Sequence, residues 1–164
     1  MSKSGKPIIY WDTNVWIAII GEETTNPIYE GSMYAMERVA KSEVELVLSE
    51  FVRLELVKTN LNPKSEENFS NVLKRSNVEK LSISSKIVNI ASDLQKEAAR
   101  AIKGKVLKTV DAVHLATAIY SKADELYVAD GDLLTLDGKL KMYNAPKISC
   151  PPLKPQMDLP LFQK

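Results

Sequence analysis

Short runs of β-forming residues alternate along this chain with longer segments whose apolar residues recur at helical spacing. The β-rich runs are residues 7–11, 44–48, 78–83 and 125–130, and a further edge strand is expected at 147–150. The helical segments are residues 15–20, 27–41, 49–60, 65–76, 84–103 and 109–123. Parallel strands need crossover connections, so the alternation predicts an α/β fold: a three-layer α/β/α sandwich around a mostly parallel sheet.

Residues that commonly begin or end helices support the predicted limits of two helical segments. Ser49 is a preferred N-cap residue at the start of the helical segment 49–60, and Pro63 predicts that this helix stops before it. Gly104 directly follows the segment 84–103, and a glycine commonly ends a helix.

The composition bounds the class of protein. With 164 residues, 45% apolar and 26% charged, the chain suits one globular domain, which we expect at residues 1–150. Residues 151–164 contain four prolines and no helical pattern, so we expect an extended tail there. Asp12 and Asn14 interrupt the apolar stretch near the N-terminus, and no run is long enough to span a membrane. We therefore expect a cytoplasmic protein with no signal peptide and no membrane contact.

The chain has a single cysteine, Cys150, and a single histidine, His114. These counts exclude a disulfide framework and a zinc site built from cysteine and histidine, so a bound metal must be held by oxygen. Glycine motifs for dinucleotides or for a phosphate loop are absent. The formal net charge of +1 provides no basic field for nucleic acid, unless acidic residues gather in a metal site whose ion reverses their local sign.

Acidic residues gather where the predicted strands end. In open α/β sheets, ligands bind beyond the carboxyl ends of the strands. Asp12 follows the first strand, and Asp130, with Asp132 two residues on, ends the fourth. Asp111 opens the helix that leads into that fourth strand. Glu55 falls on the apolar arc of its own helix, where a carboxylate needs a partner.

Each of these residues also has an ordinary structural explanation. Asp12 and Asp111 stand where helices begin, and aspartate is a preferred N-cap residue. Glutamate is common in helices, which accounts for Glu55. Asp130 and Asp132 flank Gly131, as turn residues often do. Glu50 lies on the same apolar arc as Glu55 and is the second choice of glutamate. Together, however, four or five carboxylates at one edge would repel one another unless cations neutralised them. Mg²⁺ or Mn²⁺ fits such a site and suits in-line hydrolysis of a phosphodiester.

Four segments resemble the motifs of the PIN-domain nucleases, and in particular of the VapC-type toxins of bacterial and archaeal toxin–antitoxin pairs. They are DTNV at 12–15, SEFVRLEL at 49–56, DAVHLATAIY at 111–120 and VADGDLL at 128–134. The resemblance covers nearly the whole chain apart from the tail. It departs from the usual form at Val128, where a hydroxyl is common, and at Leu133, where an aromatic residue is common.

The resemblance implies a Rossmann-like PIN fold and a metal-dependent endoribonuclease. The catalytic acids that it implies are Asp12, Glu55, Asp111 and Asp130, the ligands of Mg²⁺ or Mn²⁺ are Asp12, Asp111, Asp130 and Asp132, and Asn14 is a supporting polar neighbour. Glu55 either binds metal or orients the attacking water. RNA is the implied substrate, cut to leave 5′-phosphate and 3′-hydroxyl ends, and a cognate antitoxin and a second copy of the chain are the implied partners.

Other residues near these motifs have competing interpretations. Lys103, Lys105 and Lys108, just before Asp111, suit contacts with an RNA backbone and equally suit a solvated loop. His114 invites an acid–base role, but we favour a packed or hydrogen-bonded histidine. The rival function, from another class, is a catalytically silent PIN-like scaffold that binds RNA or protein.

The tail carries a weaker signal. The stretch from Gln156 to Phe162 resembles the short peptides with which bacterial replication proteins bind the sliding clamp. The interpretation that we favour is that its apolar residues fold back onto the protein's own surface or onto a dimer partner.

Overall fold

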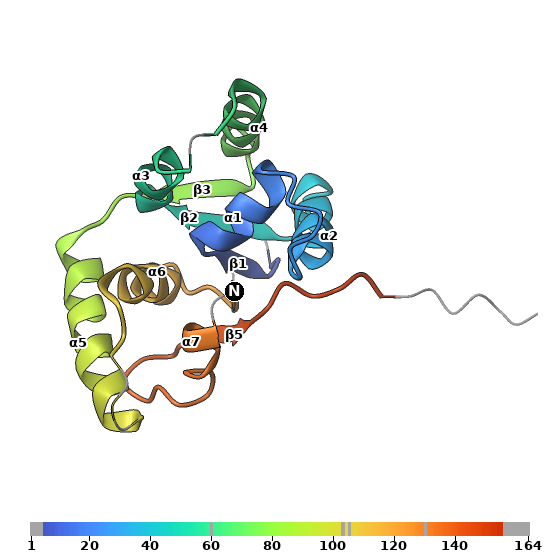
Figure 1. Cartoon of the computed structure of the whole chain (residues 1–164). Helices are drawn as coiled ribbons and strands as arrows, with labels where there is room; N and C mark the ends of the chain where they lie inside the picture. The colour runs from blue at the N-terminus through green and yellow to red at the C-terminus, as the bar shows by residue number, and fades with distance from the viewer. Residues whose placement is uncertain (1–4, 60, 103, 105, 130, 156–164) are drawn as a thin grey trace, which may run out of the picture.

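Helices and strands alternate along the chain in the computed structural model, which describes residues 5–59, 61–102, 104, 106–129 and 131–155 (Figure 1). The elements are β1 (Ile8–Trp11), α1 (Thr13–Ile20), α2 (Tyr29–Ala40), β2 (Glu45–Ser49), α3 (Phe51–Val57), α4 (Pro63–Leu73), β3 (Val78–Leu81), α5 (Ser85–Ala101), α6 (Thr109–Tyr120), β4 (Glu125–Tyr127), α7 (Gly131–Leu134) and β5 (Lys147–Ser149). All strand pairs are parallel, in the order β3-β2-β1-β4-β5. The predicted α/β fold with a parallel sheet and an edge strand near residue 148 is therefore confirmed.

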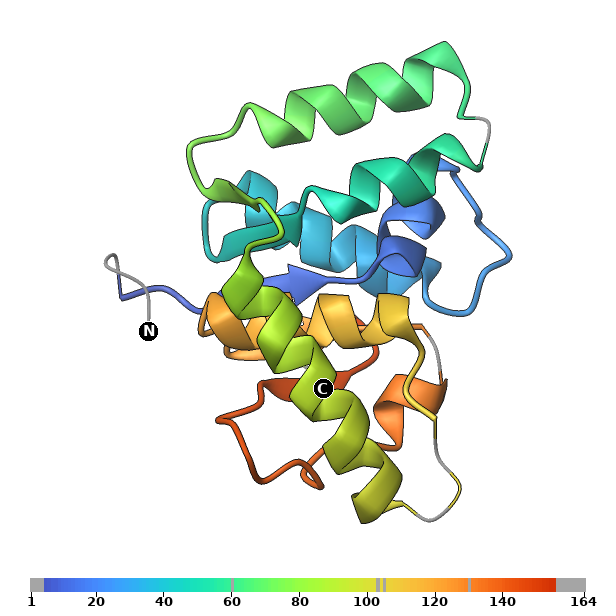
Figure 2. The same cartoon turned by 90° about the vertical axis from the view of Figure 1, so that its left-hand side faces the viewer.

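Helices cover both faces of the sheet, as Figures 1 and 2 show from two sides. The side chains of β1 alternate between two apolar clusters. Ile8 and Tyr10 pack with α5 and α6, whereas Ile9 and Trp11 pack with α1 and α2. All four side chains are buried, which explains why this central strand is a continuous apolar run. Among the described helices, none is both long and apolar enough to cross a membrane.

The strand order makes the carboxyl end of β1 a topological switch point of the sheet. The chain moves outward from β1 to β2 and β3, and then returns to place β4 on the other side of β1. At such a switch point the connections leave the sheet in opposite directions, and ligands bind between them. The backbone N–H of Asp12 donates to the carbonyl of Tyr127 at 3.0 Å, which holds the ends of β1 and β4 together.

α3 begins later than predicted. Ser49 is the last residue of β2, where it pairs with Leu81 of β3, and the N-cap is Glu50, which makes no side-chain cap bond. The Oγ of Ser49 still accepts a hydrogen bond from the N–H of Phe51 at 3.2 Å. Pairing within the sheet therefore moved the helix start by one residue.

Other helix limits also shift by a few residues. α4 begins at Pro63 rather than at residue 65, because the Oδ1 of Asn62 accepts from the N–H of Ser65 at 2.9 Å and caps the helix. α5 ends at Ala101, and Gly104 follows with a φ of +79°, in the left-handed region. A turn was one of the two interpretations of the residues around Gly131, and the structure has the four-residue helix α7 there.

Candidate active site

Asp12 lies directly after β1, at the switch point of the sheet. It is the N-cap of α1, and its Oδ1 accepts a hydrogen bond from the N–H of Val15 at 3.0 Å. Only 4% of the residue is exposed. Burial raises the pKa of Asp12 from the ordinary 3.8 to about 6, against the opposing effect of backbone N–H groups such as those of Val15 and Ala129. Asp12 is therefore a cap, and it is also a carboxylate held out of water.

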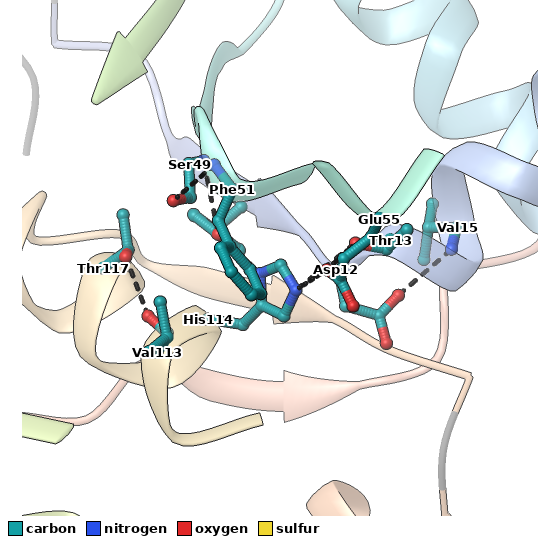
Figure 3. Close-up of polar contacts among 10 residues, drawn as sticks. Asp12, Thr13, Val15, Ser49, Phe51, Glu55, Val113, His114 and Thr117 are labelled. Carbon is teal, nitrogen blue, oxygen red and sulfur yellow. Dashed lines mark hydrogen bonds and ion pairs between the residues drawn. The ribbon is translucent and has the colours of Figure 1, made fainter. Parts of the chain in front are cut away.

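Glu55 reaches the same place from α3. Its Oε2 accepts a hydrogen bond from the hydroxyl of Thr13, the residue next to Asp12, and lies 2.7 Å from the Nε2 of His114 (Figure 3). Burial by itself raises the pKa of Glu55, but the hydrogen bonds from His114 and Thr13 outweigh burial, and the net effect is a lowered pKa. The carboxylate on the apolar arc of its helix therefore has the polar partners that it needs and stays ionised at neutral pH.

His114 links Glu55 to the interior of the sheet. The residue is 2% exposed, and its Nδ1 lies 2.8 Å from the hydroxyl of Tyr10. The oxygen of Tyr10 in turn accepts from the backbone N–H of Ser49 at 3.3 Å. The ring of Phe51 packs against the imidazole with centroids 6.2 Å apart. The histidine is thus packed and hydrogen-bonded, as favoured from the sequence, but its bond to a candidate site carboxylate was missed.

Three further candidates lie at the starts of helices. α6 begins at Thr109 with Lys108 as its N-cap, so Asp111 is the third residue of the helix and not its cap. Asp111 is half-buried, whereas Asn14 in α1 and Asp132 in α7 are exposed. The first turn of a helix favours a carboxylate, which accounts for the position of Asp111 in α6 without assigning it a function.

Glu50, the second choice of glutamate, points elsewhere. It is exposed, and its Oε2 accepts from the hydroxyl of Ser82 at 2.6 Å. Glu55 is the glutamate of this region that contacts Thr13 and His114. The choice between the two carboxylates depends on how α3 packs, which the helical wheel did not distinguish.

Several sequence-based candidates lie outside the described residues: Asp130, Lys103, Lys105 and the stretch from Gln156 to Phe162. Within the described ranges, no three or more histidine, cysteine, aspartate or glutamate side chains are grouped so as to hold a metal ion. Val128 and Leu133, the two departures from the usual motif, are both buried in the apolar cluster beneath α5 and α6. Their apolar side chains therefore serve packing.

The chemistry of the described donors nevertheless fits a hard divalent cation. Asp12 and Glu55 supply oxygen ligands of the kind that Mg²⁺ and Mn²⁺ prefer. The raised pKa of Asp12 is the mark of a buried carboxylate that lacks a neutralising charge, and a nearby cation would favour its ionised form. The site also lies at the carboxyl edge of the sheet, at a switch point, where ligands of open α/β folds bind.

The PIN domain family model matches residues 9–141, which is most of the chain. The chain therefore belongs to the PIN domain family. This confirms the family resemblance of its four motifs. No curated protein matches the chain.

Solved structures share the fold over nearly their whole length. A toxin–antitoxin complex from Klebsiella pneumoniae matches with a TM-score of 0.58 and 20% identity, over 89% of this chain and 99% of that chain. The Mycobacterium tuberculosis VapC20, a toxin that cleaves the sarcin-ricin loop, matches with a TM-score of 0.57 and 16% identity, over 82% of this chain and 98% of that chain. VapBC2 from Rickettsia felis, bound to a DNA fragment from the promoter, matches with a TM-score of 0.57 and 20% identity, over 75% of this chain and 88% of that chain. At these identities the likeness concerns the fold alone.

Proposed function

We propose that this PIN domain protein is a metal-dependent endoribonuclease and the toxin of a type II toxin–antitoxin pair. The observation that carries the proposal is the meeting of the buried Asp12 and the hydrogen-bonded Glu55 at the carboxyl edge of a parallel sheet. Membership of a family whose members are generally nucleases supports it. Similarity of fold to VapC toxins supports the finer assignment to RNA.

The proposed roles follow from the chemistry of each side chain. The ligands of Mg²⁺ or Mn²⁺ are Asp12, Asp111, Asp130 and Asp132. When bound, either ion supplies neutralising charge for the phosphodiester and a nucleophile at neutral pH. Glu55, ionised because its pKa is lowered, accepts a hydrogen bond from the attacking water and orients it. Asn14, exposed on α1 beside Asp12, is a polar neighbour at the mouth of the site.

Substrate contacts come from the lysines that precede α6. Lys108 is exposed at the N-cap of this helix, three residues before Asp111. With Lys103 and Lys105 it offers positive charge to the phosphates of RNA beside the acidic site. Hydrolysis by an activated water leaves 5′-phosphate and 3′-hydroxyl ends.

The proposed partners are a cognate antitoxin and a second copy of the chain. A similar solved structure is a toxin–antitoxin complex, which supports the antitoxin. The second copy of the chain is proposed from the family resemblance alone, because Ala35 and Val39 of α2 are buried in the protein's own core. We divide the chain into a nuclease domain at residues 1–150 and a tail at 151–164, and the described part of this tail forms neither helix nor strand.

Cleavage of a mixed pool of labelled RNAs by the purified protein tests the proposal. Reactions contain Mg²⁺, Mn²⁺ or a chelator, and the variants are Asp12→Asn, Asp111→Asn and Glu55→Gln. Glu50→Gln is the matched control, because this neighbouring glutamate is exposed and bonded to Ser82. We expect cleavage with metal, none with chelator, and loss in the three site variants but not in the control.

The alternative function gives a different result. A catalytically silent scaffold binds RNA or protein without cutting RNA in any metal. Absence of cleavage together with no change in melting temperature on addition of Mg²⁺ or Mn²⁺ would contradict the nuclease and favour the scaffold.

A further inference from the structure

We infer that His114 is a positioning residue that holds Glu55 in one orientation, with Nε2–H donated to Glu55 and Nδ1 accepting from Tyr10. The catalytic part of this inference rests on the proposed function, because it requires that Glu55 acts in RNA cleavage. The arrangement of the hydrogen bonds does not rest on it and has a separate test.

The partners on its two sides determine which ring nitrogen of His114 carries hydrogen. An ionised carboxylate only accepts hydrogen bonds, so the contact of 2.7 Å with Glu55 requires a hydrogen on Nε2. On the other side, the Tyr10 oxygen already accepts from the N–H of Ser49. A phenol carries its proton at neutral pH, and Nδ1 at 2.8 Å is placed to accept it in a hydrogen bond.

The nearby hydroxyl of Thr117 does not change this assignment. It donates to the carbonyl of Val113 at 2.7 Å, so its hydrogen is used within α6 and is not offered to Tyr10. The hydrogen bonds therefore run in one direction, from Tyr10 to His114 and from His114 to Glu55. Glu55 on one side and Tyr10 on the other therefore favour the same tautomer of the imidazole.

Both donors to Glu55 bind the same oxygen. Thr13 and His114 meet Oε2, and among the described residues none donates to Oε1. Rotation of the carboxylate would break both bonds, so the two donors hold Glu55 in one orientation and leave Oε1 bonded to neither of them. His114 is 2% exposed, is covered by Phe51 and has both nitrogens engaged, so it acts through Glu55 rather than on substrate.

The hydrogen-bond arrangement is tested by nuclear magnetic resonance with ¹⁵N-labelled histidine. His114 is the single histidine of the chain, so one pair of ring signals reports on this site. We expect a protonated Nε2 and an unprotonated Nδ1 at neutral pH, and a shift of the Nδ1 signal in Tyr10→Phe, which removes the hydroxyl that bonds to Nδ1. Tyr143→Phe is the control, because its hydroxyl bonds to Asp93 far from the site. A hydrogen on Nδ1 in the wild type, or an Nδ1 signal that does not move in Tyr10→Phe, would overturn the assignment.

The positioning role is tested by kinetics of RNA cleavage. His114→Leu is expected to lower kcat by about 10- to 100-fold with little change in KM, as loss of a residue that orients a ligand or acid commonly does. His114→Gln keeps an N–H donor at the same number of bonds from the backbone as Nε2 and is expected to recover part of kcat. Melting curves check folding. A wild-type kcat in folded His114→Leu would refute the role, as would a folded His114→Gln that recovers nothing.

The two tests separate this inference from the proposed function. If the wild-type protein cuts no RNA, the nuclease proposal fails and the catalytic part of the inference fails with it. The resonance measurement then still decides the tautomer of His114. If His114→Leu does not fold, Tyr10→Phe takes its place in the kinetic test, with a reduced kcat expected and an unchanged kcat contradicting the inference.

Discussion

Replacement of Asp12 by asparagine is expected to stabilise the fold at neutral pH when metal is absent. Burial raises the pKa of this carboxyl group from 3.8 to about 6, a difference that corresponds to about 3 kcal/mol of lost stability once the group is ionised. Asparagine keeps a side-chain oxygen that can cap α1 through Val15, but it carries no charge. Its NH2 group, which replaces the second carboxylate oxygen, cannot accept from the N–H of Ala129, so we expect a net gain of about 1–2 kcal/mol.

The direction of the pH dependence follows from the raised pKa. The native carboxyl group binds its proton more tightly than the unfolded one does. Its contribution to stability is therefore fully present below about pH 4 and is lost as the pH rises through 6. The asparagine variant has no such group at this position. The advantage of the variant over the wild type is thus smallest near pH 4, increases up to about pH 7, and is constant above that.

Thermal denaturation in the presence of a chelator, at pH 4.5 and pH 7.5, measures this difference. At pH 7.5 we expect the melting temperature to rise by about 2–8 °C in Asp12→Asn. Asp124→Asn is the matched control, because Asp124 is exposed at the opposite end of the sheet and accepts from the N–H of Ile8. Its stability should stay within about 0.5 kcal/mol of the wild type. A loss of stability in Asp12→Asn at pH 7.5, or a difference that is equal at both pH values, would refute the reasoning.

Three further substitutions test other contacts. Gly31→Ala would bring a Cβ to 2.4 Å from the carbonyl oxygen of Pro151, so we expect a loss of about 1–3 kcal/mol in urea denaturation, and no loss would contradict this packing. Asn62→Ala removes the cap of α4 and should cost about 0.5–2 kcal/mol by the same measurement. Thr13→Val removes a hydrogen bond to Glu55 at nearly constant volume, and we expect kcat for RNA cleavage to fall by about 10-fold while the fold is kept. An unchanged kcat would show that this bond does not matter for the reaction.

Much of the fold was predictable because its signals are local. The strand 7–11 and the helix 109–123 are recognisable from patterns that span only a few neighbouring residues. The position of Asp12 at a strand end was visible in the same way. Ser49 shows the limit of such reasoning. Serine is a preferred N-cap residue, but the backbone of Ser49 pairs with β3. A pattern of neighbouring residues contains no information about that distant strand.

The contacts of the candidate site were not predictable from local patterns. Glu50 and Glu55 lie on the same arc of a helical wheel, yet one bonds to Ser82 and the other to Thr13 and His114. Those two bonds of Glu55 join residues 42 and 59 positions apart. The link from Tyr10 to His114 spans 104 positions. Such pairs depend on the strand order and on how α3 and α6 pack.

The sequence by itself determined the order of helices and strands, the parallel sheet and the placing of Asp12 at its carboxyl edge, because propensity, periodicity and crossover rules act over short distances. Only the tertiary structure decided that Asp12 is nearly excluded from water and that Glu55 is the glutamate that joins it. The physical reason is that burial and hydrogen bonding depend on every element packed around a side chain, and these elements come from distant parts of the chain.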